Sequence, residues 1–209
     1  PVEFSKSLDW ALRLVLLIGM PASVGLLLLA EPMLSTLFQY QAFASGDVLL
    51  AGESLKAYSI GLLGFILVKV LVPGFTSRKD MKTPVRFGIY AMIANMGLNI
   101  MLVFPLAHAG LALATSLGAF FNASLLLTKL LKDRIYKPGK NWANFIVKII
   151  FANEIMALFL YCFVDAEQWF QWAAFDRAIN LALWVCLGGL VYALSLLLVG
   201  VRPKNIFHK

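Results

Sequence analysis

The sequence predicts an all-α protein that crosses a lipid bilayer several times, and two observations carry this prediction. Of 209 residues, 61% are hydrophobic and only 14% are charged, whereas soluble domains are roughly half apolar and a quarter charged. The apolar residues also gather in stretches of about 20 residues, the length that a helix needs to span the hydrocarbon layer. Such continuous stretches do not suit barrel strands, and helices pair their own backbone groups. We therefore expect a polytopic helical membrane protein with six transmembrane helices.

The first two expected spans cover about 11–37 and 57–76. An amphipathic approach, Phe4 to Arg13, leads into the first span. Pro21 lies inside that span, and a proline there removes a backbone hydrogen bond, so we expect a kink. Pro73-Gly74 ends the second span, since proline cannot continue the helix cheaply and glycine tolerates the turn.

The third and fourth expected spans, about 84–106 and 109–131, form a helical hairpin, because only the short stretch 105–108 separates them. Thr83 is a candidate N-cap for the third span, and Pro84 suits its first helical position.

The fifth and sixth expected spans cover about 142–164 and 178–201. A basic connection precedes them.

Lysine and arginine concentrate in alternate connections, whereas the connections after spans one, three and five carry mainly aspartate and glutamate. Positive loops stay on the cytoplasmic side, so we expect both ends of the segment to be cytoplasmic. The net charge of +7 is therefore a topology signal, and we expect no nucleic acid partner. The basic residues are Arg78, Lys79, Lys82, Arg86, Lys129, Lys132, Arg134, Lys137, Lys140, Arg202, Lys204 and Lys209.

The sequence contains no catalytic or metal-binding pattern. His108 and His208 stand apart, in a loop and in the tail, and Cys162 and Cys186 fall in spans without metal-ligand spacing. We expect both cysteines to be buried thiols, with a disulfide as the lesser alternative. An enzyme and a cofactor are therefore not expected, which leaves a transporter or a structural bundle. The chain begins without methionine, at Pro1, so we expect a piece of a longer protein.

Charged side chains inside the spans are candidates for function, because a charge in hydrocarbon costs several kcal/mol. Lys69 can face a polar interior or extend to the headgroups. Glu154 is deeper, near the middle of span five, with Asn153 beside it as a possible hydrogen-bond partner. Arg13 and Lys148 lie near span ends, where extension to the headgroups explains both.

Polar residues also face each other in the predicted hairpin. Asn95 and Asn99 are four residues apart and share one helix face, and Thr115 lies on the next helix. Hydrogen bonding between helices is the favoured interpretation. A weak site for a monovalent cation is the alternative, since the set holds no carboxylate.

One stretch resembles a known family. Residues 68–85 read V-K-V-L-V-P-G-F-T-S-R-K-D-M-K-T-P-V, similar to the loop between helices ten and eleven of the MurJ (MviN) family of lipid II flippases, K-x-x-x-P-G-F-Y-(A/S)-R-x-D-x-(K/R)-T-P. Thr76 replaces the usual aromatic residue. Residues 37–43 resemble the family's L-F-x-x-G-x-F with Gln41 in place of glycine, and residues 108–127 resemble its twelfth helix.

The resemblance implies that the six spans are helices nine to fourteen of a fourteen-helix, two-lobe transporter. It also implies a division of the chain into a four-span unit, 1–136, and a carboxy-terminal helix pair, 137–209. Such a protein carries lipid II, the undecaprenyl-linked peptidoglycan precursor, across the bacterial cytoplasmic (inner) membrane by alternating access. Its partners are then lipid II, membrane lipids and the amino-terminal helices that this chain lacks. The residues that grip the pyrophosphate headgroup are expected in those helices, and spans five and six are expected to form a groove for the lipid tail.

The motif loop and the charges inside the spans together give candidate site residues. Arg78 and Asp80 are expected to pair, or to cap helices, across a cytoplasmic gate, and a solvated hinge loop is the alternative. The candidates for substrate contact or gating are Lys69, Arg78, Asp80, Lys82, Thr83 and Glu154.

Some family members hold sodium with an asparagine and an aspartate on the eleventh helix and a threonine on the twelfth. The matching positions here are Asn95, Asn99 and Thr115. Asn99 stands where the carboxylate is expected, so the charge that offsets sodium's desolvation is missing. We expect tight sodium binding to be lost, and the membrane potential to drive transport in preference to a monovalent cation.

Two other functions stay open at this point. One is export by another member of the same superfamily, which moves drugs or polysaccharide-linked lipids. The other is a scaffold that recruits cell-wall enzymes without transport.

Overall fold

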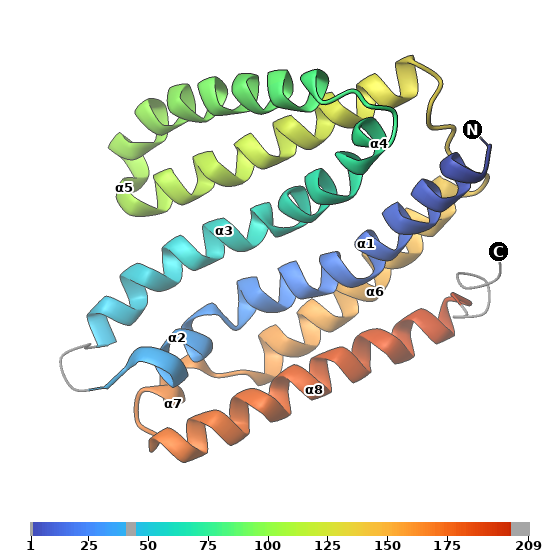
Figure 1. Cartoon of the computed structure of the whole chain (residues 1–209). Helices are drawn as coiled ribbons and strands as arrows, with labels where there is room; N and C mark the ends of the chain where they lie inside the picture. The colour runs from blue at the N-terminus through green and yellow to red at the C-terminus, as the bar shows by residue number, and fades with distance from the viewer. Residues whose placement is uncertain (1, 41–44, 202–209) are drawn as a thin grey trace.

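The computed structural model describes residues 2–40 and 45–201, and this part of the chain is helical, with no strand. Its helices are α1 (Val2–Leu28), α2 (Ala30–Phe38), α3 (Ser45–Leu71), α4 (Pro73–Thr76), α5 (Lys82–Lys132), α6 (Trp142–Phe163), α7 (Ala166–Trp169) and α8 (Ala174–Leu198) (Figure 1). Within the described residues, five stretches are long and apolar enough to cross a membrane: α1, α3 with α4, α5, α6 and α8. The predicted all-α membrane fold is confirmed.

α5 is a helical hairpin that supplies two of the predicted spans. The chain reverses at Ala107, whose φ of 46° and ψ of −122° are not helical, and the two arms run back along each other (Figure 1). Gly110 is needed for this close turn, because a Cβ there would lie 2.6 Å from the carbonyl carbon of Leu102. The turn expected at 105–108 is therefore where the sequence placed it.

The first span is interrupted near its end, and the kink expected at Pro21 stays a prediction. α1 continues through Pro21 and ends at Leu28, and the chain leaves the helical conformation at Leu29, with φ −98° and ψ 13°. Pro32 explains this position. It has no N–H to donate to the carbonyl of Leu28, and its ring would clash with that carbonyl in a continuous helix.

The helix ends fall into two groups at opposite ends of the bundle. The start of α1, the loop 77–81, the connection 133–141 and the end of α8 lie together, and we call this the basic end (Figure 1). α2, α7 and the turn of α5 lie at the other end, which we call the far end. The alternation of basic and acidic connections in the sequence thus corresponds to two separate ends of the structure.

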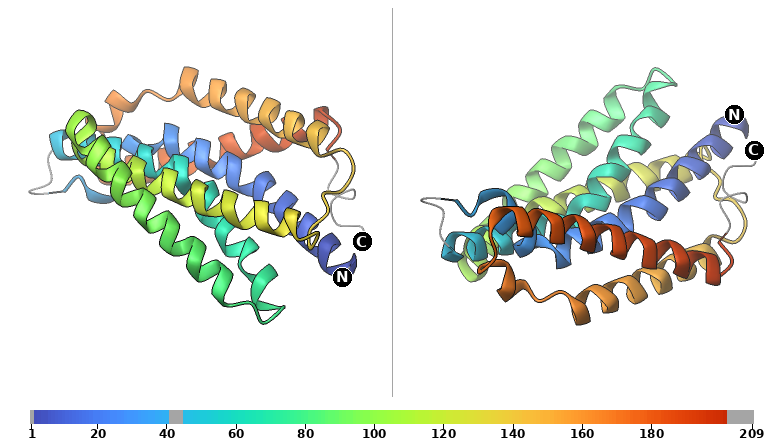
Figure 2. Two further views of the ribbon diagram at one scale, coloured as in Figure 1. Left: turned by 90° about the horizontal axis from the view of Figure 1, so that it is seen from above. Right: turned by 90° about the horizontal axis from the view of Figure 1, so that it is seen from below.

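α1 is shared by two hydrophobic cores, and it runs between α5 on one side and α6 on the other (Figure 2). The first core joins α1 through Leu8 and Leu12 to α3, α4 and the second arm of α5. The second core joins α6 and α8, around Ile149 and Tyr192, to the later part of α1. α1 therefore belongs to both cores, and the division of the chain at 136 stays a prediction.

The cysteines correct one expectation. Cys162 and Cys186 are free and exposed on the outer faces of α6 and α8. They were expected to be buried because they sit in apolar segments, but these helices bury only one stripe against the bundle. Apolar sequence alone does not tell that stripe from a face turned toward lipid.

Candidate functional site

The loop that follows α4 is a fixed turn. The Asp80 N–H donates to the carbonyl of Phe75 at 3.1 Å, and the Lys79 N–H donates to the carbonyl of Thr76 at 2.9 Å. This pairing is a Schellman motif. Lys79 takes the left-handed conformation, with φ 62°, that glycine usually occupies. Phe75 is 1% exposed and anchors the motif in the first core.

Asp80 caps the start of α5, which corrects the expectation that Thr83 is the N-cap. The Thr83 N–H donates to Asp80 Oδ1 at 3.1 Å. The hydrogen bonds from Thr83, with a smaller contribution from the charge of Lys129, lower the pKa of Asp80 below its ordinary value of 3.8. A carboxylate at a helix N-terminus also interacts favourably with the helix dipole. Asp80 therefore competes for the cap more effectively than the neutral hydroxyl of Thr83.

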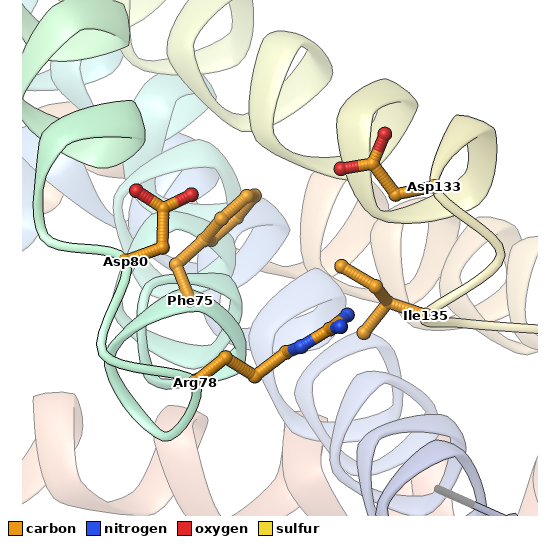
Figure 3. A pocket seen from close by; sticks show the side chains of 5 residues that line it. All are labelled: Phe75, Arg78, Asp80, Asp133 and Ile135. Carbon is orange, nitrogen blue, oxygen red and sulfur yellow. The ribbon is translucent and has the colours of Figure 1, made fainter.

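The loop forms one wall of a pocket of about 420 Å³ at the basic end (Figure 3). Phe75, Arg78 and Asp80 come from this wall, and Asp133 and Ile135 come from the end of α5. The Arg78 side chain extends toward Ile135 and away from the Asp80 carboxylate. No ion pair joins Arg78 to Asp80 in the part of the chain that the structure describes, so the expected pairing is not formed. Of the two roles expected for these residues, Asp80 has that of a helix cap.

The opposite wall ends in a second turn of the same kind. The Ile135 N–H donates to the carbonyl of Leu130 at 3.0 Å, and Arg134 is left-handed with φ 55°. Asp133 forms an ion pair with Lys129 at 2.9 Å. Two Schellman turns therefore face each other across the pocket, and each has a cation, Lys79 or Arg134, at its left-handed position. Among the described residues, the Arg78 guanidinium at this pocket has no acid partner.

Lys69 and Lys82, the other basic candidates of the motif, lie outside this pocket. Lys69 is exposed in the last turn of α3, and Lys82 is exposed at the first position of α5. The structure therefore brings together Arg78 and Asp80 from the predicted set, with the backbone of Thr83 next to them.

Glu154 lies far along α6 from the basic end and faces away from the bundle. It is exposed, whereas the neighbouring Asn153 is buried and donates its side-chain N–H to the carbonyl of Ile149 at 2.9 Å. The suggested bond between Asn153 and Glu154 is therefore not formed. Successive helix positions point about 100° apart, which turns one side chain inward and the other outward.

The three positions of the degenerate sodium site lie on the two arms of the α5 hairpin, and no hydrogen bond joins them among the described residues. The Oδ1 atoms of Asn95 and Asn99 are buried and receive no hydrogen bond from the described residues. The Thr115 hydroxyl donates within its own helix, to the carbonyl of Leu111 at 2.9 Å. The expected hydrogen bonds between helices come instead from Ser116, whose hydroxyl donates to the carbonyl of Ala57 at 2.7 Å.

A second, apolar pocket of about 330 Å³ lies in the other half of the molecule. The sequence analysis expected the last two helices to form a groove by themselves, but α1 and α2 supply a further wall. Small residues open the space: Gly25 on α1, and Gly188 and Gly189 on α8. The other lining residues are Pro21, Ala22, Leu26, Leu29, Met33, Met156, Leu160, Leu181, Trp184, Val185 and Tyr192.

Two arginines near helix ends, Arg13 and Arg177, have specific partners. Arg13 was expected to extend to the headgroups, but its Nε donates to Asp9 Oδ2 at 2.9 Å. Arg177 is buried at the far end and donates to the carbonyls of Ser35 at 3.2 Å and Phe170 at 3.3 Å. The partners of Arg177 are backbone carbonyls that no local pattern indicates, whereas the pair of Arg13 with Asp9 has the i,i+4 spacing of a helical ion pair.

Comparisons with known proteins agree on one family. Residues 2–199 match the family model described as lipid II flippase MurJ. A probable lipid II flippase MurJ of Haemophilus influenzae is 39% identical over 209 residues, which are 100% of this chain and 41% of that protein. Its counterpart in Vibrio cholerae is 41% identical over 204 residues, 97% of this chain and 39% of that protein.

A solved structure of lipid II flippase MurJ, in an inward closed conformation, has the same fold. The TM-score is 0.74 at 25% identity, over 92% of this chain and 38% of that one. The chain thus spans about two fifths of the length of the relatives that it matches.

Proposed function

The chain belongs to the MurJ family of lipid II flippases, and from that membership we propose that it forms the carboxy-terminal part of a carrier for the undecaprenyl-linked peptidoglycan precursor. The carrier moves this lipid across the bacterial cytoplasmic membrane by alternating access. The relatives are more than twice as long as this chain. The pyrophosphate headgroup is therefore left to helices outside it, and this segment supplies part of the path for the lipid tail.

The apolar pocket between α1 and the α6–α8 pair is the observation that carries this proposal beyond family membership. A space of about 330 Å³ lined almost entirely by apolar side chains suits a hydrocarbon chain, because such a site needs no polar partner. The outer faces of α6 and α8 are apolar too, but they are convex helix surfaces. The pocket is where a polyprenyl tail makes contact on several sides.

The basic end is proposed to face the cytoplasm. Both basic connections, 77–81 and 133–141, lie there together with the start of α1 and the end of α8 (Figure 1), and positive connections remain on the cytoplasmic side. The segment then sits in the inner membrane with both ends inside. Membrane lipids surround its exposed apolar faces.

Arg78 and Asp80 are proposed to act at the cytoplasmic gate. Asp80 fixes where α5 begins through the Thr83 N–H, and Arg78 offers an exposed guanidinium at the mouth of the basic-end pocket (Figure 3). Lys69 and Lys82 supply further positive charge at this end. Glu154 stays a candidate for contact with a helix or lipid outside the bundle.

Coupling to the membrane potential is proposed in place of tight sodium binding. Asn95, Asn99 and Thr115 offer neutral oxygens, and without a carboxylate they compensate sodium's charge poorly. Sodium chloride should then stabilise the protein no more than potassium chloride in thermal unfolding. A sodium-specific rise in Tm that Asn99→Ala abolishes would overturn this part of the proposal.

The carrier proposal is tested by filling the pocket. A Cβ at Gly189 has no atom within 4 Å, so Gly189→Ala is tolerated and is the matched control, whereas the longer side chain of Gly189→Leu takes up pocket space. In cells depleted of their own flippase, the full-length protein that contains this chain should prevent accumulation of unflipped precursor. Gly189→Ala should rescue and Gly189→Leu should not, at equal abundance.

The same assay separates a carrier from a scaffold. A scaffold acts through the surface that binds its partner enzymes. It would therefore rescue the cells even with the pocket filled, or with the central cavity of the full-length protein blocked by crosslinking. Full rescue by Gly189→Leu, or by the crosslinked protein, would contradict the carrier proposal.

A further inference from the structure

One carboxylate at the basic end receives an unusual number of hydrogen bonds. Asp9, on α1, accepts at Oδ1 from the Tyr136 hydroxyl at 2.7 Å, the Trp142 indole N–H at 2.7 Å and the Gly139 N–H at 2.9 Å. Its Oδ2 accepts from Arg13 Nε at 2.9 Å. A carboxylate has about four acceptor positions, so Asp9 is fully used by this chain.

All three donors to Oδ1 belong to the connection between α5 and α6 or to the first residue of α6. Asp9 therefore fastens this connection to α1 along its length. Gly139 gives the carboxylate room, because a Cβ there would lie 2.9 Å from Asp9 Oδ2 and would push that side chain aside. Ser5, one turn earlier on α1, accepts the Lys137 N–H at 3.0 Å and extends the contact.

Arg13, also on α1, contacts the end of the connection and the first turn of α6. Its second guanidinium nitrogen donates to the carbonyl of Lys140 at 3.0 Å. The guanidinium carbon lies 5.2 Å from the ring centre of Trp142 and 5.3 Å from that of Phe145, within the range of cation–π attraction. The first turn of α6 is thus held to α1 by the Trp142 hydrogen bond and by the cation–ring contacts, while the ion pair within α1 orients the Arg13 guanidinium.

The Tyr136 hydroxyl is a reliable donor in this cluster. The side chain is 3% exposed, and burial together with the hydrogen bond to Asp9 raises the pKa of Tyr136 above its ordinary value. The phenol therefore keeps its proton, and the bond to Asp9 persists wherever the carboxylate is charged.

The consequence concerns the apolar pocket. α1 is one of its walls and the α6–α8 pair is the other, and the chain enters this pair through the connection that Asp9 holds. Asn141, left-handed with φ 68°, sets the direction in which α6 leaves that connection. Fixing the connection to α1 therefore fixes the origin and the direction of α6.

We propose that Asp9 is a positioning residue that sets the spacing of α1 from the α6–α8 pair, and through it the width of the pocket for a long apolar chain. The spacing follows from the contacts alone, whereas the effect on the lipid tail rests on the proposed function. The residue acts through Tyr136, Gly139 and Trp142, and it touches no substrate.

The spacing is measured in the full-length protein with spin labels on exposed positions outside the pocket, Ile18 on α1 and Leu190 on α8, after Cys162→Ser and Cys186→Ser. Asp9→Ala should broaden the distance distribution and move its mean by about 2 Å, the scale of helix shifts at interfaces. Asp9→Asn keeps the Oδ1 acceptor and loses the charge next to Arg13, so it should restore most of the native distribution.

Two further variants keep the test decisive. Asp133→Asn, which breaks the exposed pair with Lys129 on the same connection, should leave the distance unchanged. Tyr136→Phe removes one donor and should broaden the distribution less than Asp9→Ala does, and it serves if that variant fails to fold. The proposal would be overturned by an unchanged distance distribution in Asp9→Ala, or by an equal change in Asp133→Asn. If Asp9→Ala does not fold, an unchanged distribution in Tyr136→Phe would overturn it.

The second readout is binding of polyprenyl phosphates of two lengths. Asp9→Ala should weaken binding of the undecaprenyl compound more than that of a short-chain analogue, with recovery in Asp9→Asn. A changed spacing with no length-dependent loss would leave the positioning role standing and count against the tail pocket.

Discussion

The interface between α3 and α5 and the interface among α1, α6 and α8 are built from different residues. In the first, Gly61 and Gly64 of α3 face Ser116 and Ala119 of α5, close enough that a Cβ on either glycine would overlap the partner backbone. In the second, large side chains such as Met156, Leu160 and Tyr192 surround a pocket of about 330 Å³.

This difference matters because water does not drive helices together inside lipid. Close packing of small residues and hydrogen bonds between helices take over that role, and the first interface has both, through the bond from Ser116 to the carbonyl of Ala57. The second interface has two such bonds among the described contacts of these three helices: one at the basic end, from the Trp142 indole N–H to Asp9 at 2.7 Å, and one from the Tyr192 hydroxyl to the carbonyl of Leu17 at 2.8 Å. Around the pocket, however, its packing is open, and none of the described glycines there makes a close contact with small residues like that of Gly61. The first interface is a fixed frame, and the second can admit an apolar chain.

The largest expected effect comes from adding one carbon to the fixed frame. In Gly61→Ala, the new Cβ would lie 2.6 Å from Ser116 Cα, so the two backbones must separate. Overpacking of this kind costs about 3 kcal/mol. Thermal unfolding in detergent should show a clear loss of Tm. Gly97→Ala, where no atom lies within 4 Å of the Cβ, is the control and should be neutral or slightly stabilising. Equal Tm values for the two variants would remove the contrast between the interfaces.

A smaller effect is expected from a hydrogen bond that crosses the fixed frame. Ser116→Ala removes the donor to the carbonyl of Ala57 and should cost about 1 kcal/mol. Ser195 is also buried, but its hydroxyl donates to Val191 within α8, so Ser195→Ala should cost less. Denaturation in mixed micelles compares the two. A larger loss of stability in Ser195→Ala than in Ser116→Ala would contradict the idea that hydrogen bonds between helices stabilise the α3–α5 interface.

The sequence predicted the framework well for a physical reason. Span length, basic connections and the turn at 105–108 are properties of neighbouring residues, and they reappear in the helix bounds and the two ends of the bundle. Pro21 and Pro32 show the limit of such reasoning. Both favour a break, and only the geometry of the carbonyl at Leu28 shows which of them interrupts the first span.

The candidate site was predicted less completely, because its contacts join distant residues. The four hydrogen bonds to Asp9 include three from residues more than 120 positions away. Nothing near Asp9 in the sequence indicates these three distant hydrogen bonds. Without them the sequence indicated no partner for Arg13 beyond its own helix, and Arg13 was assigned to the headgroups. For Glu154 the missing information was the direction of one side chain on a helix that is apolar on every face.

A still smaller effect concerns the turn at 77–81, and it bears on the α3–α5 half as a fixed frame. Lys79→Gly relieves a left-handed lysine, and the gain is partly offset by glycine's greater freedom in the unfolded chain. We expect a net gain of about 0.5 kcal/mol. Denaturant unfolding should detect it, with Lys137→Gly, on the neighbouring connection, as a control that should not stabilise. A destabilised Lys79→Gly would mean that the lysine side chain itself holds the turn.

The smallest effect is expected from Asp80, and it depends on pH. Its folded pKa lies below the ordinary value of 3.8, so the stability it contributes is present above that pH and is lost as the pH falls through the folded pKa. Asp80→Asn should therefore lower Tm slightly at neutral pH and flatten the acid limb below about pH 4. Hydrogen exchange should locate the change at 77–85. A change in hydrogen exchange throughout the protein would contradict the view that Asp80 acts only on the start of α5.

The most direct test of the difference between the two interfaces is photo-crosslinking of lipid II in membranes. A photoreactive amino acid at Leu26, in the pocket between α1 and α8, should form an adduct with the undecaprenyl chain that excess polyprenyl phosphate suppresses. The same residue at Ile93, on the exposed face of α5, should label ordinary membrane lipids without this competition. Equal and uncompeted labelling at both positions would show that the pocket is only another surface in contact with the bilayer.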